Sequence, residues 1–368
     1  LTVTLFATNA LGQRLVTYDT NGVRPLSAAP AFGVHPRIYF NAEDLSAIRA
    51  RLTNTAVGRE AFTMLKHYTS ILRNGRSAGY DSLPATNRTM PDGTARISNV
   101  GLYDQSLYYT NLVAGSTNNV SALATNGSGA TFAYVLASSM AMEGFECLVN
   151  EGQPGVAQRM TNLASALTTW AEWANAQATN FYPGVNAGSA WRFGGSQTAV
   201  AYDFAHSAMT PTQRATVRRA LARMAIGHVQ EGYYGVNVTP EAANSNWALI
   251  FSFRIFPFLA IEGEVTQAHD GLSSEQVATY ITGVMNAVHK YCTYGIWPGG
   301  EPFEGQGKNA LYGCHLIPWA RRGWNFFEHP HVKAYARRWM PATVQPFGSS
   351  FTLYDLLGGT GFHPELTG

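Results

Sequence analysis

The stretch Met209-Thr-Pro-Thr-Gln-Arg214 decides the fold class, because it marks a turn between two predicted helices. Thr210 is predicted to cap the second helix, and Pro211 takes the first helical position, where the N–H that proline lacks would have no partner anyway. We therefore expect helices over 196–208 and 211–230, packed as an antiparallel pair.

Outward from this turn, the apolar residues keep a helical period over most of the chain. A helix is expected after the N-cap Asn41, with Leu45, Ile48 and Leu52 on its apolar stripe. Further helices are predicted over 60–72, 130–149, 155–177, 246–262, 274–293, 307–322 and 331–340. The helix over 246–262 is apolar on every side, which indicates an inner, buried helix. Ser273 and Gln276 form a capping box at the start of the helix over 274–293.

Paired helices without alternating strands predict an all-α fold, an (α/α) toroid built as an incomplete barrel of helical hairpins. A helical solenoid is the alternative, but the chain shows no repeat of fixed length. We expect an N-terminal segment over 1–34, with a short β-hairpin and a linker, and the toroid domain over 35–345. An irregular C-terminal tail is expected over 346–368.

The composition excludes several classes of partner. Of the 368 residues, 46% are hydrophobic and 13% are charged, so we expect a sizeable buried core. The net charge of +2 provides no global field to hold nucleic acid or an anionic membrane. No apolar run reaches the length of about 18 residues needed for a membrane span.

The cysteines, the ends of the chain and the lysine content give expectations about disulfide bonds, processing and cellular location. Cys147, Cys292 and Cys314 have no zinc-site spacing, so we expect either one bridge between Cys292 and Cys314 or buried free thiols. The chain has no initiator methionine and no signal peptide, which suggests a processed or trimmed piece. The low lysine content suits a secreted or periplasmic protein, and we expect a monomer.

Three polar clusters are candidates for chemistry. The first is Gly188-Ser-Ala-Trp-Arg-Phe-Gly-Gly195, placed before the helix that carries Tyr202 and Asp203. The second is Asn244-Ser-Asn-Trp247, at the start of the most apolar helix. The third is Gly295-Ile-Trp-Pro-Gly-Gly-Glu-Pro-Phe-Glu-Gly-Gln-Gly307.

The third cluster leads into Lys308, Tyr312 and His315, whose spacings of four and three residues place them on one helix face. A lysine, a tyrosine and a histidine on one helix face are poorly suited to a buried hydrophobic core and well suited to a catalytic or binding site. Trp297 and Glu304 lie among glycines, where a stacking surface and an acid would suit a sugar. The alternative is a Gly/Pro loop without a role.

The second cluster and the histidines are open to either a structural or a functional interpretation. The two asparagines of the second cluster are either helix caps or, for Asn246, a donor that binds a carboxylate without adding charge. His206 and His269 lie near acids, but a lone histidine is more often structural. His329-Pro-His331 is interpreted as a loop, because no carboxylate lies at ligand spacing. His35-Pro-Arg37 is interpreted as a packing element, and no metal or cofactor is expected.

Several of these segments resemble the α/α-toroid polysaccharide lyases, which include the alginate lyases and the heparinase II/III-like enzymes. The similar segments are His35-Pro-Arg-Ile-Tyr-Phe40 with Ala42–Arg51, Tyr202-Asp-Phe with Met209–Arg214, Asn244–Trp247, and Pro298–Gly307. The likeness covers roughly residues 35–325, and its first motif is the most specific. It implies a secreted enzyme that cleaves an anionic polysaccharide.

The chain also departs from the family pattern. Pro298 replaces the aspartate that precedes Gly-Gly in the family, and Trp247 follows Asn246 where the family has a histidine. The family tyrosine would fall at Lys308 or Asn309, whereas the nearest one here is Tyr312. Many relatives also carry a C-terminal β-sheet domain, so this chain is either from a single-domain branch or a shortened piece.

The resemblance implies β-elimination at a uronic acid, which needs a neutraliser for the carboxylate, a base for the C5 proton and an acid for the leaving oxygen. Asn246 is assigned as the neutraliser, with Arg192 or His206 as helpers. Tyr312 is assigned as the base or acid, and Lys308 or His315 adjusts or replaces it. The expected substrate-binding residues are Trp191, Tyr202, Asn244, Trp247, Trp297, Glu301 and Glu304.

Alginate and glucuronan are the expected polymers, because a near-neutral chain does not suit a densely sulfated ligand. One alternative is a toroid glycoside hydrolase, for which Asp203, Glu301 and Glu304 supply carboxylates. The other alternative is a helical domain that binds glycan without cleaving it.

Overall fold

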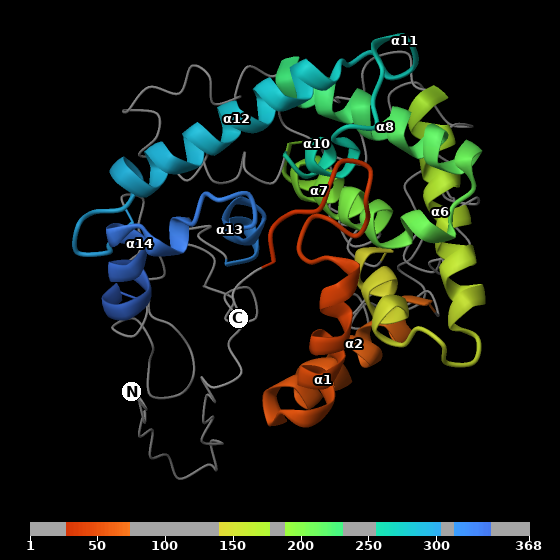
Figure 1. The fold of residues 1–368 in the computed structure, drawn as a ribbon, viewed down its shortest axis with the longest axis horizontal. Coiled ribbons are helices and arrows are strands. Elements are labelled where there is room, and N and C mark those ends of the chain that lie inside the picture. Colours follow the sequence, from red (N-terminus) through yellow and green to blue (C-terminus); the bar gives the residue numbers. More distant parts are fainter. Residues whose placement is uncertain (1–26, 74–139, 177–187, 231–254, 303–312, 340–368) are drawn as a thin grey trace, which may run out of the picture. The chain divides into compact units, whose positions relative to one another are not determined.

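The computed structural model describes residues 27–73, 140–176, 188–230, 255–302 and 313–339, most of which are helical (Figure 1). Within these ranges no strand forms, and one isolated antiparallel bridge joins Ile296 and Pro302. The prediction of a mainly helical chain is confirmed for this part. The expected hairpin near the N-terminus and the expected tail lie outside the described residues.

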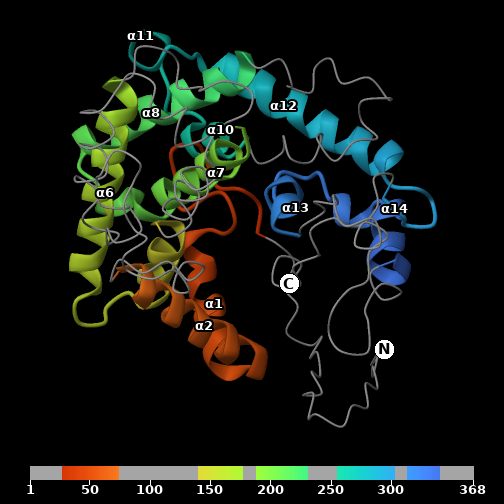
Figure 2. The same cartoon turned by 180° about the vertical axis from the view of Figure 1, so that it is seen from behind.

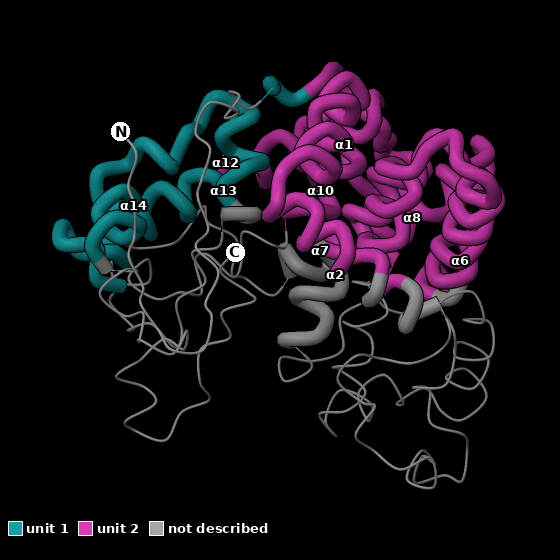
Figure 3. The backbone as a smooth tube through the Cα atoms, turned by 90° about the horizontal axis from the view of Figure 1, so that it is seen from below, with its two compact units in different colours: residues 1–29, 235–252, 284–368 teal, residues 30–234, 253–283 magenta. Residues whose placement is uncertain are grey.

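The chain divides into two compact units, each described by itself (Figure 3). Unit 1 consists of Leu1–Ala29, Gly235–Ser252 and Val284–Gly368. Unit 2 consists of Pro30–Tyr234 and Phe253–Gly283. The predicted domain over 35–345 contributes residues to both units.

Unit 2 begins with a short helical entry. The 3-10 helix η2 (Ala42–Asp44) leads into α1 (Leu45–Asn54), and α2 (Ala56–Arg73) packs against α1. The Asp44 carboxylate accepts a hydrogen bond from the Asn41 backbone N–H at 2.8 Å, which closes the start of the helix. Leu45 is buried, and Ile48 and Leu52 are half-buried, as the predicted stripe requires.

The centre of unit 2 is a group of long helices that pack on one another. Residues 140–149 are helical, and α6 (Val156–Ala176), α7 (Gly188–Ala205), η6 (His206–Ala208) and α8 (Pro211–Gln230) follow. Among the described helices, α6 packs most extensively against α8, and α7 packs mainly against α10 (Phe256–Ile261) (Figure 1, Figure 2). Helices that are not neighbours in the chain therefore lie side by side.

Local capping explains where α8 begins. The Thr210 N–H donates to Gln213 Oε1 at 2.9 Å, and the Gln213 N–H donates to Thr210 Oγ1 at 3.3 Å. This reciprocal pair satisfies two N–H groups that the first turn leaves without helical partners. The predicted turn and the helix over 211–230 are both confirmed.

The start of α7 corrects one expectation. The sequence places Gly188–Gly195 before the helix, whereas the structure makes it the first turns of α7. Its three glycines lower the intrinsic helix propensity by about 1 kcal/mol each, which is why the pattern resembles a loop. The rest of α7 is largely buried and carries apolar residues such as Val200, Ala201 and Phe204, so its packing outweighs that preference.

Burial identifies α10, and a capping box marks the start of α12 (Ser274–Lys290), the last helix that unit 2 contains in part. All six residues of α10 are buried, as predicted for the inner helix. The short helix α11 (Gln267–Asp270) precedes α12, whose residues 274–283 belong to unit 2 and whose remaining residues belong to unit 1. A capping box opens α12, since Ser273 N–H donates to Gln276 Oε1 at 2.8 Å and Gln276 N–H donates to Ser273 Oγ at 3.1 Å.

Unit 1 contains shorter helices. The π-helix η9 (Tyr291–Gly295) continues from α12, and α13 (Gly313–Ala320), the 3-10 helix η10 (Phe326–Glu328), α14 (Pro330–Ala334) and the π-helix η11 (Tyr335–Trp339) follow. The His329 ring accepts a hydrogen bond from the His331 N–H at 3.3 Å, so His329 caps α14. His329-Pro-His331 is therefore the start of a helix rather than the predicted loop.

Cys147 and Cys292 are free and buried. Of the two predicted alternatives, the structure shows the free thiol at Cys292, without a bridge to Cys314. Burial raises the pKa of the Cys292 thiol to about 12, so it stays protonated near neutral pH. Among the described helices, none has both the length and the apolarity to cross a bilayer.

Candidate functional site

A buried polar network in unit 2 is the candidate site, and its centre is Asp203 near the end of α7. Asp203 accepts backbone hydrogen bonds from Arg37 N–H at 2.8 Å and 3.0 Å and from Ile38 N–H at 2.9 Å. These N–H groups belong to an irregular segment and would otherwise be buried without partners. The fully buried carboxylate thus fixes this segment onto α7.

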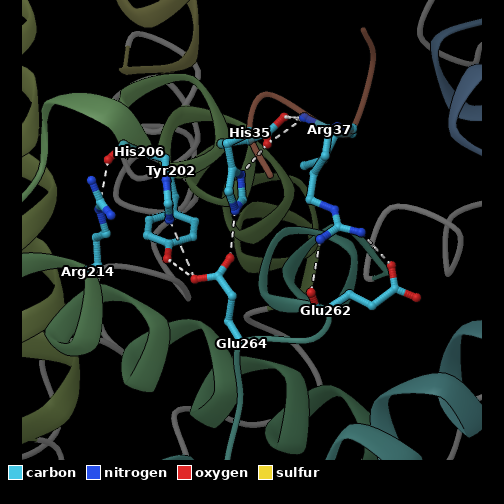
Figure 4. A network of polar contacts seen from close by, with 9 residues as sticks. His35, Arg37, Tyr202, His206, Arg214, Glu262 and Glu264 are labelled. Carbon is cyan, nitrogen blue, oxygen red and sulfur yellow. Dashed lines mark hydrogen bonds and ion pairs between the residues drawn. The ribbon is translucent and has the colours of Figure 1, made fainter. Parts of the chain in front are cut away.

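His35 links Asp203 to a second carboxylate (Figure 4). Its Nδ1 lies 2.6 Å from Asp203 Oδ1, and its Nε2 lies 2.6 Å from Glu264 Oε1. Burial by itself lowers the pKa of His35, but the hydrogen bonds to Asp203 and Glu264 outweigh it and raise the pKa above the ordinary value. His35 is therefore an imidazolium that donates from both ring nitrogens.

Glu264 gathers three side chains around its carboxylate. Besides His35, the Tyr202 hydroxyl donates to Oε2 at 2.9 Å, and His206 Nε2 lies 3.5 Å from the same oxygen. Burial alone would raise the pKa of Glu264, but the contacts with His206 and His35 lower it well below the ordinary value. The carboxylate is thus ionised throughout the neutral range.

Tyr202 is held in its neutral form. It is fully buried, and burial, followed by the negative charge of Glu264, raises the pKa of its hydroxyl far above the ordinary value. A buried phenol that donates to a carboxylate cannot serve as a proton-accepting base. This placement favours a role in holding Glu264 over the expected role in binding substrate.

His206 lies on the outer side of His35. The two imidazole rings stack with centroids 3.9 Å apart and planes 19° apart. Burial, and then the positive charge of His35, outweigh Glu264 and lower the pKa of His206 below the ordinary value. His206 is neutral at neutral pH, and its side chain keeps 13% of its surface exposed. It can accept a proton or donate a hydrogen bond to a ligand.

Two arginines support this arrangement from the periphery. Buried Arg37 donates to the Glu262 carbonyl oxygen at 2.9 Å and to Glu262 Oε2 at 3.0 Å. Arg214 donates from Nε to the His206 carbonyl oxygen at 2.9 Å, which ties η6 to α8. The segment at 35–38, the end of α7 and the segment after α10 are thereby joined.

One group of potential metal ligands occurs among the described residues, namely His35, His206 and Glu264. Their ligand atoms lie within 4.8 Å of one another. The in-plane lone pairs of the stacked imidazoles lie in two nearly parallel planes, which do not meet at one ion between the rings, and both nitrogens of His35 already face carboxylates. The geometry fits an ion-pair network better than a metal site.

The structure brings two of the predicted site residues, His206 and Tyr202, into one network. Trp297 and Glu301 lie in unit 1, where Trp297 N–H donates to the Glu301 carbonyl oxygen at 2.8 Å. The Trp297 side chain is 53% exposed, which leaves it open to a ligand. Trp191 and Arg192 are in α7 and His315 is in α13, with side chains outside the description. The remaining candidates, which are Asn244, Asn246, Trp247, Glu304, Lys308 and Tyr312, lie outside the described residues.

The sequence reasoning missed most of the network. The sequence indicates His35-Pro-Arg37 as a packing element and as part of the family resemblance, but it assigns no site role to His35, Glu262 or Glu264. The available signal was two acids on either side of Gly263, directly after a fully apolar helix. Charged residues next to a buried helix need partners, so this pattern could have suggested a buried ion pair.

Comparison with known proteins gives no family for this chain: no family model matches it, and no curated protein does.

The network predicts a stability maximum near pH 6.5. The raised pKa of His35 stabilises the fold fully below 6.5, and this contribution is lost as the pH rises through the folded value. The lowered pKa of His206 acts in the opposite sense, since its contribution is lost as the pH falls below 6.5. The lowered pKa of Glu264 removes further stability below pH 4.5.

Urea unfolding across this pH range measures the effect. We expect the free energy of unfolding to fall on the alkaline side of the maximum in the parent protein, and the slope of that fall to diminish in the His35→Gln variant. Equal alkaline slopes in the two proteins would mean that His35 is not an imidazolium in the folded state.

Proposed function

We propose that this chain is a polysaccharide lyase that cleaves a uronic-acid-containing polymer, alginate or glucuronan, by β-elimination. The observation that carries the proposal is that two segments of the family resemblance, 166 residues apart, meet at one carboxylate. Asp203 of the Tyr202-Asp-Phe segment binds the backbone of Arg37 and the ring of His35. Convergence of these segments supports the idea that they belong to the fold that the resemblance implies.

The helix packing supports the proposed toroid. An (α/α) toroid has an inner and an outer layer, so alternate helices of the chain must pack side by side. The packing of α6 against α8, with α7 between them in the chain, is a pairing of this kind. The complete burial of α10 suits a helix of the inner layer.

The proposed chemistry divides elimination among side chains of this chain. Asn246 donates to the uronate carboxylate and stabilises the negative charge that develops there. Tyr312, with Lys308 or His315 beside it, takes the proton from C5; the C4–O4 bond then breaks, a C4–C5 double bond forms, and an acid protonates the departing O4. Neutral His206 is retained as a further donor or acceptor, because its side chain keeps 13% of its surface exposed.

Trp297 supports the sugar-binding part of the proposal. It is a large aromatic side chain, more than half exposed, next to the exposed Glu301. An exposed indole offers an apolar face for a sugar ring, while a neighbouring carboxylate can accept hydrogen bonds from hydroxyl groups.

The hydrolase alternative is weakened by the position of Asp203. A glycosidase needs two carboxyl groups that reach the scissile bond from its two sides. Asp203 has no exposed side-chain surface and already accepts hydrogen bonds from His35, Arg37 and Ile38. Of the three carboxylates considered for hydrolysis, it cannot be one that contacts a substrate.

The test is a panel of polymers that includes alginate, glucuronan, a sulfated glycosaminoglycan and a neutral mannan. We expect ultraviolet absorbance from the new C4–C5 double bond to rise with alginate or glucuronan and to stay flat with the neutral polymer, which lacks the acidic C5 position. New reducing ends without absorbance would identify a hydrolase. Binding without new ends would identify a non-catalytic domain, and either result would reject the lyase.

A further inference from the structure

A second feature of unit 2 is a pocket of about 550 Å³ between the helices α8, α11 and α12. The helix α8 contributes Arg219, Arg223 and Ile226; the segment from α11 contributes Gln267 to Leu272; α12 contributes Gln276 and Tyr280. The volume lies within the range of about 300–1,000 Å³ that is usual for small-ligand sites. None of the residues assigned to the elimination is among these.

Two arginines, Arg219 and Arg223, line the pocket together with one acid that is already engaged within the protein. Asp270 is the one acidic side chain among the described residues that line it. Its carboxylate is buried and already binds Arg218 Nε at 3.1 Å and 3.2 Å, and His269 Nδ1 at 2.7 Å. It also accepts the Thr266 N–H at 2.9 Å, so its capacity as an acceptor is used within the protein.

Arg219 and Arg223 are one helical turn apart on α8 and line the same pocket. Arg223 is fixed in place, since its Nη1 donates to the carbonyl oxygens of Ala174 at 2.9 Å and Asn175 at 2.6 Å. Arg219 is exposed and forms no ion pair with a described residue. Burial, and then the charge of Arg219, lower the pKa of Arg223, which is the expected effect of two like charges close together. An anion between them would relieve this repulsion.

The remaining lining suits a sugar ring. Gln267 and Gln276 can donate and accept hydrogen bonds, and Tyr280 offers an aromatic face together with a hydroxyl. Leu272 and Ile226 supply an apolar surface. A guanidinium pair with amides and an aromatic ring matches a saccharide that carries carboxylates better than a bare inorganic anion.

We propose that this pocket binds a carboxylate-bearing saccharide, with the carboxylate on Arg219 and Arg223. The identification of that saccharide as a uronate oligomer rests on the proposed function, whereas the charge and lining of the pocket do not. Such a site would hold a second stretch of the polymer in addition to the stretch that is cleaved.

The test is calorimetric titration of the chain in an Asn246→Ala background, which we expect to slow cleavage of the probe by about 10²–10³-fold. The probe is a tetramer of mannuronate, and mannotetraose is the matched neutral saccharide. Arg219→Gln removes one charge from the pocket, and Arg59→Gln removes another exposed charge, from α2, as the control. We expect Arg219→Gln to weaken binding of the mannuronate tetramer roughly tenfold, as the loss of a charge-assisted hydrogen bond requires, with Arg59→Gln unchanged.

Three results would overturn the proposal: equal binding of mannotetraose, an equal loss in Arg59→Gln, or no loss in Arg219→Gln. Full displacement of the tetramer by equimolar inorganic phosphate would also overturn it, because the pocket would then be a site for simple anions. These outcomes are independent of the absorbance assay. If the polymer assay shows new absorbance but tetramer binding does not depend on Arg219, the pocket proposal alone is rejected. If tetramer binding depends on Arg219 but the polymer assay shows no absorbance, the lyase proposal alone is rejected.

Discussion

Replacing Asp203 with alanine is expected to lower the free energy of unfolding by about 3–5 kcal/mol, the usual cost of removing one partner from a buried ion pair. The change leaves the buried His35 imidazolium with one carboxylate instead of two. It also leaves the N–H groups of Arg37 and Ile38 without their acceptor. Each buried donor that loses its partner adds about 1–3 kcal/mol, so the estimate is a lower bound if the segment cannot rearrange.

Urea denaturation followed by far-ultraviolet circular dichroism measures this change. Glu172→Ala is the matched control, because it removes an exposed carboxylate from α6 and should alter stability by no more than about 0.5 kcal/mol. Asp203→Asn keeps the shape of the side chain and one acceptor oxygen, so its free energy of unfolding should lie between those of Glu172→Ala and Asp203→Ala. It serves as the test variant if Asp203→Ala does not fold. Equal stabilities for Asp203→Ala and Glu172→Ala would show that the network does not hold unit 2 together.

Replacing Asn246 with alanine is expected to lower kcat on the best polymer by about 10²–10³-fold, or about 2.7–4 kcal/mol in the activation barrier. The reason is that a preorganised donor to a developing oxyanion acts in the transition state more than in the ground state. This prediction comes from the sequence cluster at 244–247, since Asn246 lies outside the described residues. The measurement is initial-rate kinetics by ultraviolet absorbance.

Asn244→Ala is the control for this prediction, because it removes the same amide two positions earlier. We expect it to act mainly on KM, as a residue that binds substrate in the ground and transition states alike. Full activity in Asn246→Ala, with an unchanged dichroism spectrum, would show that Asn246 is a helix cap and not the neutraliser. A loss of activity accompanied by loss of helix would point to the same structural role.

The sequence by itself determined those parts of the fold that depend on neighbouring residues. The start of α8 follows from the exchange between Thr210 and Gln213, and the start of α12 follows from Ser273 and Gln276. Each capping box spans four consecutive residues, so its geometry is local and can be recognised in the letters. The burial of α10 was equally accessible, because a helix without a polar face has no side for water.

Tertiary structure decided the start of α7 and the candidate network. The glycines of Gly188–Gly195 favour a loop locally, and only the packing of the following turns against α10 makes them helical. His35 meets Asp203 across 168 residues and Glu264 across 229. No period or spacing in the sequence predicts a contact between residues so far apart. The protonation states of His35 and Tyr202 also depend on burial and on the charge of Glu264. Burial and charge separation are properties of the packed chain, which is why the sequence alone predicted Tyr202 as a substrate-binding residue and assigned no site role to His35.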